Sequence, residues 1–159
     1  MRSARSLLLK ISCFTLLATA VLAQGTCDLP QLQHQQRDAA TLQRLDTAWS
    51  VAYLRGDTNF ERCLLTPDFG EFLRNGQHKV LADELASAAK NRGKNLPIPV
   101  LPKLTVLIDG NVAVLYATTR FVGADGKTLI SRNVDYYVWR GGSWHAFFSQ
   151  QTPVEASQR

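Results

Sequence analysis

The sequence predicts an α+β fold in which helices pack against one side of an antiparallel sheet, and three observations lead to this prediction. Apolar residues recur at helical spacing between positions 30 and 90. From position 104 onward, β-branched and aromatic runs are separated by turns that contain Asp-Gly or Gly-Gly. No internal repeat and no change in composition divides the chain, so we expect a single domain.

The first 23 residues have the features of a signal peptide, with a basic start and an apolar core that is short for a membrane span. Small residues favour cleavage after Ala23, cleavage after Ala20 is an alternative, and an uncleaved membrane anchor is the competing interpretation. We therefore expect residues 1–23 to be removed and residues 24–156 to form one domain. The protein would then be exported, periplasmic or secreted, with no stable membrane anchor after cleavage.

The charge of the chain changes when the leader is set aside. Three of the 18 Lys and Arg residues lie in the leader, which leaves 15 against 13 Asp and Glu and a net charge of +2. The remaining basic residues are scattered, and the densest group, at positions 90–94, has no aromatic residues among it. We therefore expect no nucleic-acid partner.

Two cysteines remain after the leader, Cys27 and Cys63. In an oxidising compartment an even pair predicts a disulfide, and two free thiols are the alternative. Neither cysteine has a histidine in an identifiable motif, so a catalytic thiol is not expected. The chain has no His-x-x-x-His or Cys-x-x-Cys spacing, so we expect no metal site and no cofactor.

The first half of the domain predicts three helices and one short strand. An amphipathic helix within residues 30–54 is ended by Gly56, and Asp57 caps a second short helix through about Leu65. The apolar face of the first of these helices consists of Leu42, Leu45, Trp49, Ala52 and Tyr53. A short strand at 69–73 turns at Asn75-Gly76, and a third helix covers 79–89 with Val80, Leu81, Leu85 and Ala88 on one side. The proline-rich connection 91–103 cannot be a central strand.

The second half predicts a meander of four long strands. Strands at 104–108 and 112–122 precede a hairpin, 128–152, whose two strands meet at the turn Gly141-Gly142. Counting pairs outward from this turn places Trp139 opposite Trp144, Tyr137 opposite Ala146, Asp135 opposite Phe148 and Asn133 opposite Gln150, all on one face. Because neither face is cleanly polar, we expect one face to be covered and the other to line a cavity or an interface.

The order of these elements and several local motifs resemble the nuclear transport factor 2-like superfamily and, within it, the SnoaL-like branch of uncharacterised bacterial proteins. The resemblance is carried by Leu45-x3-Trp49-x2-Ala52, Arg55-Gly56-Asp57, the run from Leu64 to Phe69, Asn75-Gly76-Gln77, the run from Asp109 to Val114, the run from Arg132 to Val138, Gly142-Ser143-Trp144 and the run from Ser149 to Val154. It implies a cone-shaped roll, in which the N-terminal helices pack in a strongly curved antiparallel sheet. It also implies a pocket open at one end and a homodimer formed through the outer face of the sheet.

This fold supports many activities, so the site has to decide the function. The superfamily includes isomerases, dehydratases, cyclases, epoxide hydrolases and noncatalytic binding domains. Some relatives of this branch place a histidine six residues after the tryptophan of the final strand, where this chain has Gln150. An amide cannot transfer a proton at neutral pH, which weakens a histidine-dependent mechanism at that position.

The candidate pocket residues are Trp49, Tyr53, Asn133, Asp135, Tyr137 and Gln150. Asp135 is the candidate catalytic residue, because desolvation would raise its pKa and suit it to act as a general base, with Tyr137 or Asn133 stabilising an oxyanion. The alternative is a structural polar network in which Asp135 pairs with Arg120, Arg132 or neighbouring amides. We expect a pocket for a small, mainly apolar molecule with a binding or accessory role, and an isomerase, dehydratase or cyclase that uses Asp135 as the second candidate.

Overall fold

The structure is a computed structural model that describes residues 27–98, 102–122 and 128–154 of the 159-residue chain. The predicted signal peptide and the predicted connection between the strand 112–122 and the hairpin 128–152 lie outside the described residues. No helix in the described part of the chain is both long and apolar enough to cross a membrane.

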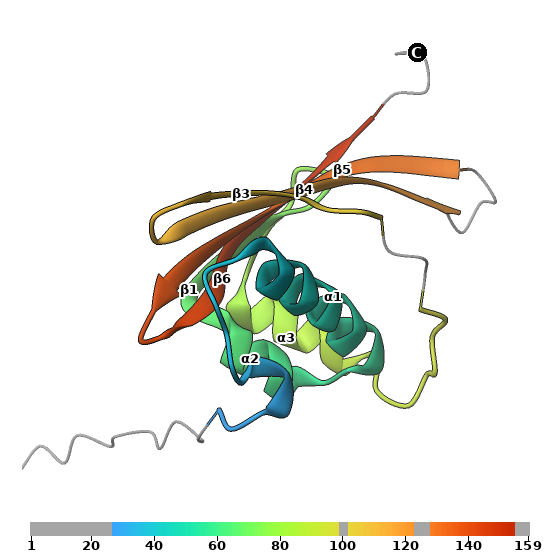
Figure 1. Cartoon of the computed structure of the whole chain (residues 1–159). Helices are drawn as coiled ribbons and strands as arrows, with labels where there is room; N and C mark the ends of the chain where they lie inside the picture. The colour runs from blue at the N-terminus through green and yellow to red at the C-terminus, as the bar shows by residue number, and fades with distance from the viewer. Residues whose placement is uncertain (1–26, 99–101, 123–127, 155–159) are drawn as a thin grey trace, which may run out of the picture.

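The helices lie together on one face of a curved six-stranded sheet that does not close into a barrel (Figure 1). After the short 3₁₀ turn η1 (Pro30–Leu32), the chain forms α1 (Ala39–Arg55), α2 (Thr58–Leu64), β1 (Leu65–Phe72), β2 (His78–Val80), α3 (Leu81–Ala89), β3 (Thr105–Asp109), β4 (Val112–Val122), β5 (Thr128–Arg140) and β6 (Ser143–Pro153). The strand order is β2-β1-β6-β5-β4-β3. The pairing of β1 with β6 is parallel and the other four pairings are antiparallel. The predicted α+β class is confirmed.

Three residues set the ends of the first two helices; Gly56 and Asp57 were predicted in these roles, whereas Asp38 was not. Asp38 caps α1 by accepting a hydrogen bond from the Thr41 amide at 2.7 Å. Gly56 ends the helix in the left-handed conformation with φ 70°, and a Cβ on it would approach the Arg92 backbone nitrogen to 2.6 Å. Asp57 then caps α2 by accepting from the Phe60 amide at 3.0 Å.

The core lies between α1 and the inner face of the sheet. α1 contributes Leu42 and Leu45, which are fully buried, and the sheet contributes Leu115, Tyr137 and Trp144, which are fully buried as well. Burial of an apolar side chain of this size stabilises the fold by roughly 1.5–3 kcal/mol. The indole N–H of Trp144 donates to the Gln36 carbonyl at 2.9 Å, so its one polar atom is also satisfied.

The disulfide expected between Cys27 and Cys63 is present, with a Cα–Cα distance of 5.4 Å. It joins the segment before η1 to the end of α2. A cross-link that closes a loop with a sequence separation of 36 is worth about 4 kcal/mol in the chain-entropy model.

Some predicted boundaries were wrong. The predicted first helix contains a non-helical segment, because regular helix begins only at Ala39 after the Asp38 cap. β1 starts at Leu65, earlier than expected, because this strand pairs with β6 as soon as α2 ends. Lys79 and Val80 belong to β2 and not to the third helix, and Val80 is exposed.

Candidate functional site

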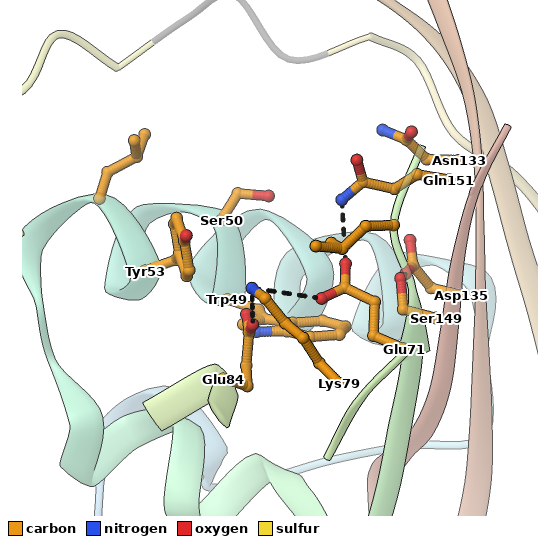
Figure 2. Close-up of a pocket in the computed structure, with 12 residues that line it drawn as sticks. Trp49, Ser50, Tyr53, Glu71, Lys79, Glu84, Asn133, Asp135, Ser149 and Gln151 are labelled. Carbon is orange, nitrogen blue, oxygen red and sulfur yellow. Dashed lines mark hydrogen bonds and ion pairs between the residues drawn. The ribbon is translucent and has the colours of Figure 1, made fainter. Parts of the chain in front are cut away.

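A cavity of about 310 Å³ lies between α1, α3 and the inner face of the sheet. Its walls come from distant parts of the chain: α1, the β1–β2 hairpin, α3, and the inward-facing residues of β5 and β6 (Figure 2). The lining residues are Trp49, Ser50, Tyr53, Leu54, Glu71, Leu73, Lys79, Glu84, Asn133, Asp135, Ser149 and Gln151. The cavity therefore has an apolar wall on α1 and a polar wall on the sheet.

One ammonium group bridges two carboxylates in this cavity. The Lys79 Nζ lies 3.1 Å from a Glu84 oxygen and 3.9 Å from a Glu71 oxygen (Figure 2). Glu71 also accepts a hydrogen bond of 2.9 Å from the Gln151 amide. Burial and the neighbouring Glu84 charge nevertheless raise the pKa of Glu71 to about 7. Burial alone would lower the pKa of Lys79, but the two carboxylates together raise it.

Asp135 faces the cavity from β5 and accepts a hydrogen bond of 2.6 Å from the Ser149 hydroxyl on β6. Burial, followed by the charge of Asp46, raises the pKa of Asp135 to about 8, while the Ser149 hydrogen bond acts in the opposite direction. Asp46 is buried on α1, and it accepts a hydrogen bond of 3.2 Å from the Tyr137 hydroxyl. Within the described residues Asp135 has no ion pair, so the arginine partners considered from the sequence are not found.

A fifth carboxyl group, Glu61 on α2, is fully buried and lies close enough to Glu84 and Glu71 for their charges to act on it. Neither of its oxygens has a hydrogen-bond partner among the described residues. Burial comes first among the causes that raise its pKa to about 8, and the charges of Glu84 and Asp57 follow. A buried carboxyl with no partner is costly to ionise, so at neutral pH Glu61 holds its proton.

The apolar wall is formed by two aromatic residues of α1. Trp49 is 9% exposed and packs edge to face on Phe69, with ring centroids 5.7 Å apart. Tyr53 lies one helical turn further along α1 and is half-buried. The side chains of both residues point toward the Lys79 and Glu84 pair in Figure 2.

The structure brings four of the six predicted pocket residues together at the cavity and leaves two outside it. Trp49, Tyr53, Asn133 and Asp135 line the cavity. Tyr137 is fully buried behind it and is bonded to Asp46, so its hydroxyl is not directed at a ligand. Gln150 is exposed and does not line the cavity.

The position of Gln150 was predicted wrongly because the hairpin contains a bulge. The pairs Trp139/Trp144 and Tyr137/Ala146 are as expected, but the next residue, Tyr136, pairs with Phe148, so Phe147 is an extra residue on β6. Asp135 consequently pairs with Ser149 and Asn133 with Gln151, in place of the expected Phe148 and Gln150. The residue six positions after Trp144 therefore points away from the cavity.

Sequence reasoning missed six polar residues of this site: Ser50, Glu71, Lys79, Glu84, Ser149 and Gln151. Alternation offered a signal for Glu71, since it lies two positions after the buried Phe69 on the same face of β1. Helical spacing offered one for Glu84, which lies four positions before the buried Ala88. Ser149 and Gln151 could not be assigned without the bulge.

The chemistry of the site is that of hydrogen bonds and proton exchange. Among the described residues, no group of three or more potential ligands is arranged to hold a metal ion. The carboxyls can bind cations or donate and accept protons near neutral pH, and the amides of Asn133 and Gln151 can orient polar groups.

Comparison with solved structures finds similar chains that cover about three quarters of this one. A protein from Cytophaga hutchinsonii described as NTF2-like is 15% identical over 75% of this chain and 100% of its own, with a TM-score of 0.64. A putative Ca/calmodulin-dependent kinase II association domain from Exiguobacterium sibiricum is 19% identical over 77% of this chain and 99% of its own, with a TM-score of 0.59. The CaMKII hub of S. rosetta is 17% identical over 76% of this chain and 99% of its own, with a TM-score of 0.60.

Sequence comparisons add nothing to these structural matches. No family model matches the sequence, and no curated protein matches it either. At identities below 25%, the likeness to the solved structures extends to the fold alone.

Proposed function

We propose that this protein, whose fold is that of the nuclear transport factor 2-like superfamily, binds a small molecule in the cavity between α1, α3 and the sheet. The observation that supports this most is the cavity itself, which keeps about 310 Å³ of space between an aromatic wall and a wall of carboxyl and amide groups. Natural ligand pockets combine these two features. Because the wall on the sheet is polar, an amphiphilic ligand fits better than the mainly apolar one expected from the sequence.

Binding fits the site better than catalysis does. A general base has to be deprotonated at the working pH, and burial holds the pKa of Asp135 at about 8. The Tyr137 hydroxyl, which was predicted to stabilise an oxyanion, donates its hydrogen bond to Asp46. No histidine is among the residues that line the cavity in the described structure.

Blocking the cavity tests the proposal. Ser50 lines the cavity from α1 and is half-buried, so Ser50→Phe would fill the space with little effect on the core. Mass spectrometry of the purified protein, with thermal shift measurements on a small-molecule library, would identify a ligand. We expect Ser50→Phe to lose it, and Ala86→Phe on the exposed side of α3 to keep it. A ligand that Ser50→Phe still binds with full affinity contradicts this proposal.

An enzyme of the isomerase, dehydratase or cyclase type remains the second candidate, because Asp135 faces the cavity and its pKa lies close to neutral. A reaction that depends on Asp135 as a base would become faster as pH rises through about 8. Asp135→Asn would abolish turnover while leaving the circular dichroism spectrum unchanged. Retained turnover in this variant would remove Asp135 from the mechanism.

We also propose a homodimer formed through the outer face of the sheet. A row of apolar residues crosses five strands there: Leu107, Val114, Tyr136, Phe148 and Phe72. Leu107 is 57% exposed and Phe72 is 43% exposed, and the helices leave this face of the sheet open (Figure 1). Similarity to the association and hub domains supports assembly of this kind.

Light scattering after size-exclusion chromatography tests the dimer. Tyr136→Glu would place a charge at the centre of the row and shift the protein to the monomer, whereas Ala86→Glu on α3 would leave the dimer intact. A monomeric wild-type protein at micromolar concentration would contradict the proposal.

Export is proposed on two grounds, the leader-like sequence of residues 1–23 and the disulfide between Cys27 and Cys63. Mass measurement of the protein isolated from the cell envelope or the medium would show cleavage after Ala23 or Ala20. A full-length cytoplasmic product would contradict this proposal.

A further inference from the structure

The cavity contains more carboxyl groups than cations. Among its lining residues, Glu71, Glu84 and Asp135 are acidic and Lys79 alone is basic. Lys79 lies closer to Glu84, at 3.1 Å, than to Glu71, at 3.9 Å. Asp135 accepts a hydrogen bond from the Ser149 hydroxyl and forms no ion pair with any cation in the described part of the chain. The lining therefore has one ammonium group for three carboxyls, and Asp135 is left without a cation.

Glu61 adds another acidic group to this region, although it does not line the cavity. Its carboxyl is fully buried, neither oxygen has a hydrogen-bond partner among the described residues, and Glu84 is the charge that raises its pKa most. Buried polar groups in native proteins are normally satisfied, so this unsatisfied carboxyl near Glu84 and Glu71 shows that acidic groups are in excess on this side of the fold.

The opposite wall suits the same kind of ligand. The rings of Trp49 and Tyr53 line the cavity from α1, and an aromatic face attracts an ammonium group as well as an apolar stem. The side-chain carbonyl oxygen of Gln151 adds a hydrogen-bond acceptor to the lining, because its amide nitrogen donates to Glu71, whereas the Asn133 carbonyl already accepts from the Ser131 hydroxyl at 3.0 Å.

We propose that the ligand is a small organic cation, a primary amine or diamine with an apolar stem. Its ammonium group binds between Asp135 and Glu71, and its stem lies along Trp49 and Tyr53. Lys79 stays with Glu84. This inference rests on the proposed binding function and names the chemical class of the ligand.

Binding of such a cation is coupled to the release of protons. Burial raises the pKa of Asp135 to about 8 and that of Glu71 to about 7, so the empty cavity holds protons at neutral pH. The charged and titratable groups that act on these two carboxyls are Asp46 and Tyr53 from α1, Glu61 from α2, Lys79 from β2, Glu84 from α3 and Tyr137 from β5. An ammonium group favours the ionised carboxyls, which lose their protons when it binds. Affinity should therefore rise between pH 6 and pH 9 by up to about tenfold per pH unit for each proton released.

Titration calorimetry with three probes of equal length tests the class of ligand: 1,6-diaminohexane, 1,6-hexanediol and adipate. We expect the diamine to bind at least tenfold more tightly than the diol, and adipate not to bind. Titrations in buffers with different ionisation enthalpies would show protons released by the wild-type protein, a measurement that needs no variant.

Matched substitutions locate the ammonium group. Asp135→Asn and Glu71→Gln should each weaken diamine binding at least tenfold at pH 8.5 and reduce the number of protons released. Asp109→Asn, at an exposed position on β3, should change neither quantity.

The possible failures separate the two proposals. Equal or tighter binding of the diol or adipate would overturn the cation assignment, and so would unchanged diamine affinity in Asp135→Asn. Failure of the diamine to bind, while another molecule is lost in Ser50→Phe, would overturn the assignment and leave the binding function in place. If no molecule of any class binds, both proposals are wrong.

Discussion

Glu61→Gln tests the energetic cost of the buried carboxyl on α2. Burial raises the pKa of Glu61 to about 8 in the folded protein, against an ordinary value of 4.5. The folded state therefore binds the proton more tightly than the unfolded state, and stability is lost as pH rises from the unfolded to the folded value. At about 1.4 kcal/mol per pKa unit, the loss approaches roughly 5 kcal/mol above pH 8.

Glutamine cannot ionise, so the variant should escape this loss. Its buried amide also lacks partners, which adds a cost of about 1–3 kcal/mol that does not change with pH. The difference in unfolding free energy between variant and wild type should therefore move in favour of the variant by several kcal/mol from pH 5 to pH 9. Other carboxyls with raised pKa values change the unfolding free energy of both proteins with pH by the same amount, so their contributions largely cancel in the difference.

Urea denaturation at pH 5, 7 and 9, followed by tryptophan fluorescence with the disulfide intact, measures this difference. Asp109→Asn removes an exposed carboxyl and serves as the control, with an expected difference near zero at each pH. A constant difference between Glu61→Gln and wild type over this range would show that Glu61 ionises normally in the folded protein and would refute the reasoning.

Three further substitutions test other contacts. Cys63→Ser breaks the disulfide and should lower the unfolding free energy by about 4 kcal/mol, a loss that should vanish when the wild type is measured with reductant. Tyr137→Phe leaves the Asp46 carboxylate without its hydroxyl donor; we expect a loss of about 1–3 kcal/mol at pH 8 and a further rise in the pKa of Asp46 by NMR titration. Gly56→Ala forces a Cβ to within 2.6 Å of the Arg92 backbone nitrogen at a positive φ, so we expect a lower melting temperature. An unchanged melting temperature would contradict the close packing seen there.

The sequence predicted the fold well because local signals and the global arrangement agree. Asp57, the left-handed Gly56 and the positive φ of Gly141 and Gly142 each set the end of an element, and residue type alone predicts them. The cap at Asp38 was not predicted and was found in the structure.

The site was predicted only in part, because it depends on register and on distant contacts. Asn133 and Asp135 were found by alternation from the turn, but alternation fails beyond a bulge, and Phe147 is not a residue type that marks one. Lys79 and Glu84 were not identified from the sequence. The pairing of β1 with β2 places Lys79 opposite Glu71, and the packing of α3 against β1 brings Glu84 to Lys79.

The bulge on β6 ties two properties of the protein to a single strand. Residues after Phe147 alternate between the cavity, where Ser149 and Gln151 lie, and the outer face, where Phe148 and Gln150 lie. Deleting Phe147 would remove the bulge and keep Phe148, Ser149 and Gln151 opposite their present partners, whereas one residue inserted after Phe148 would shift the rest of the strand by one position. That insertion would take the Ser149 hydroxyl away from Asp135 and turn Ser149 and Gln151 to the outer face. A change of length in β6 should therefore alter the cavity only when it changes the register after the bulge, whereas a deletion at the bulge itself should be tolerated.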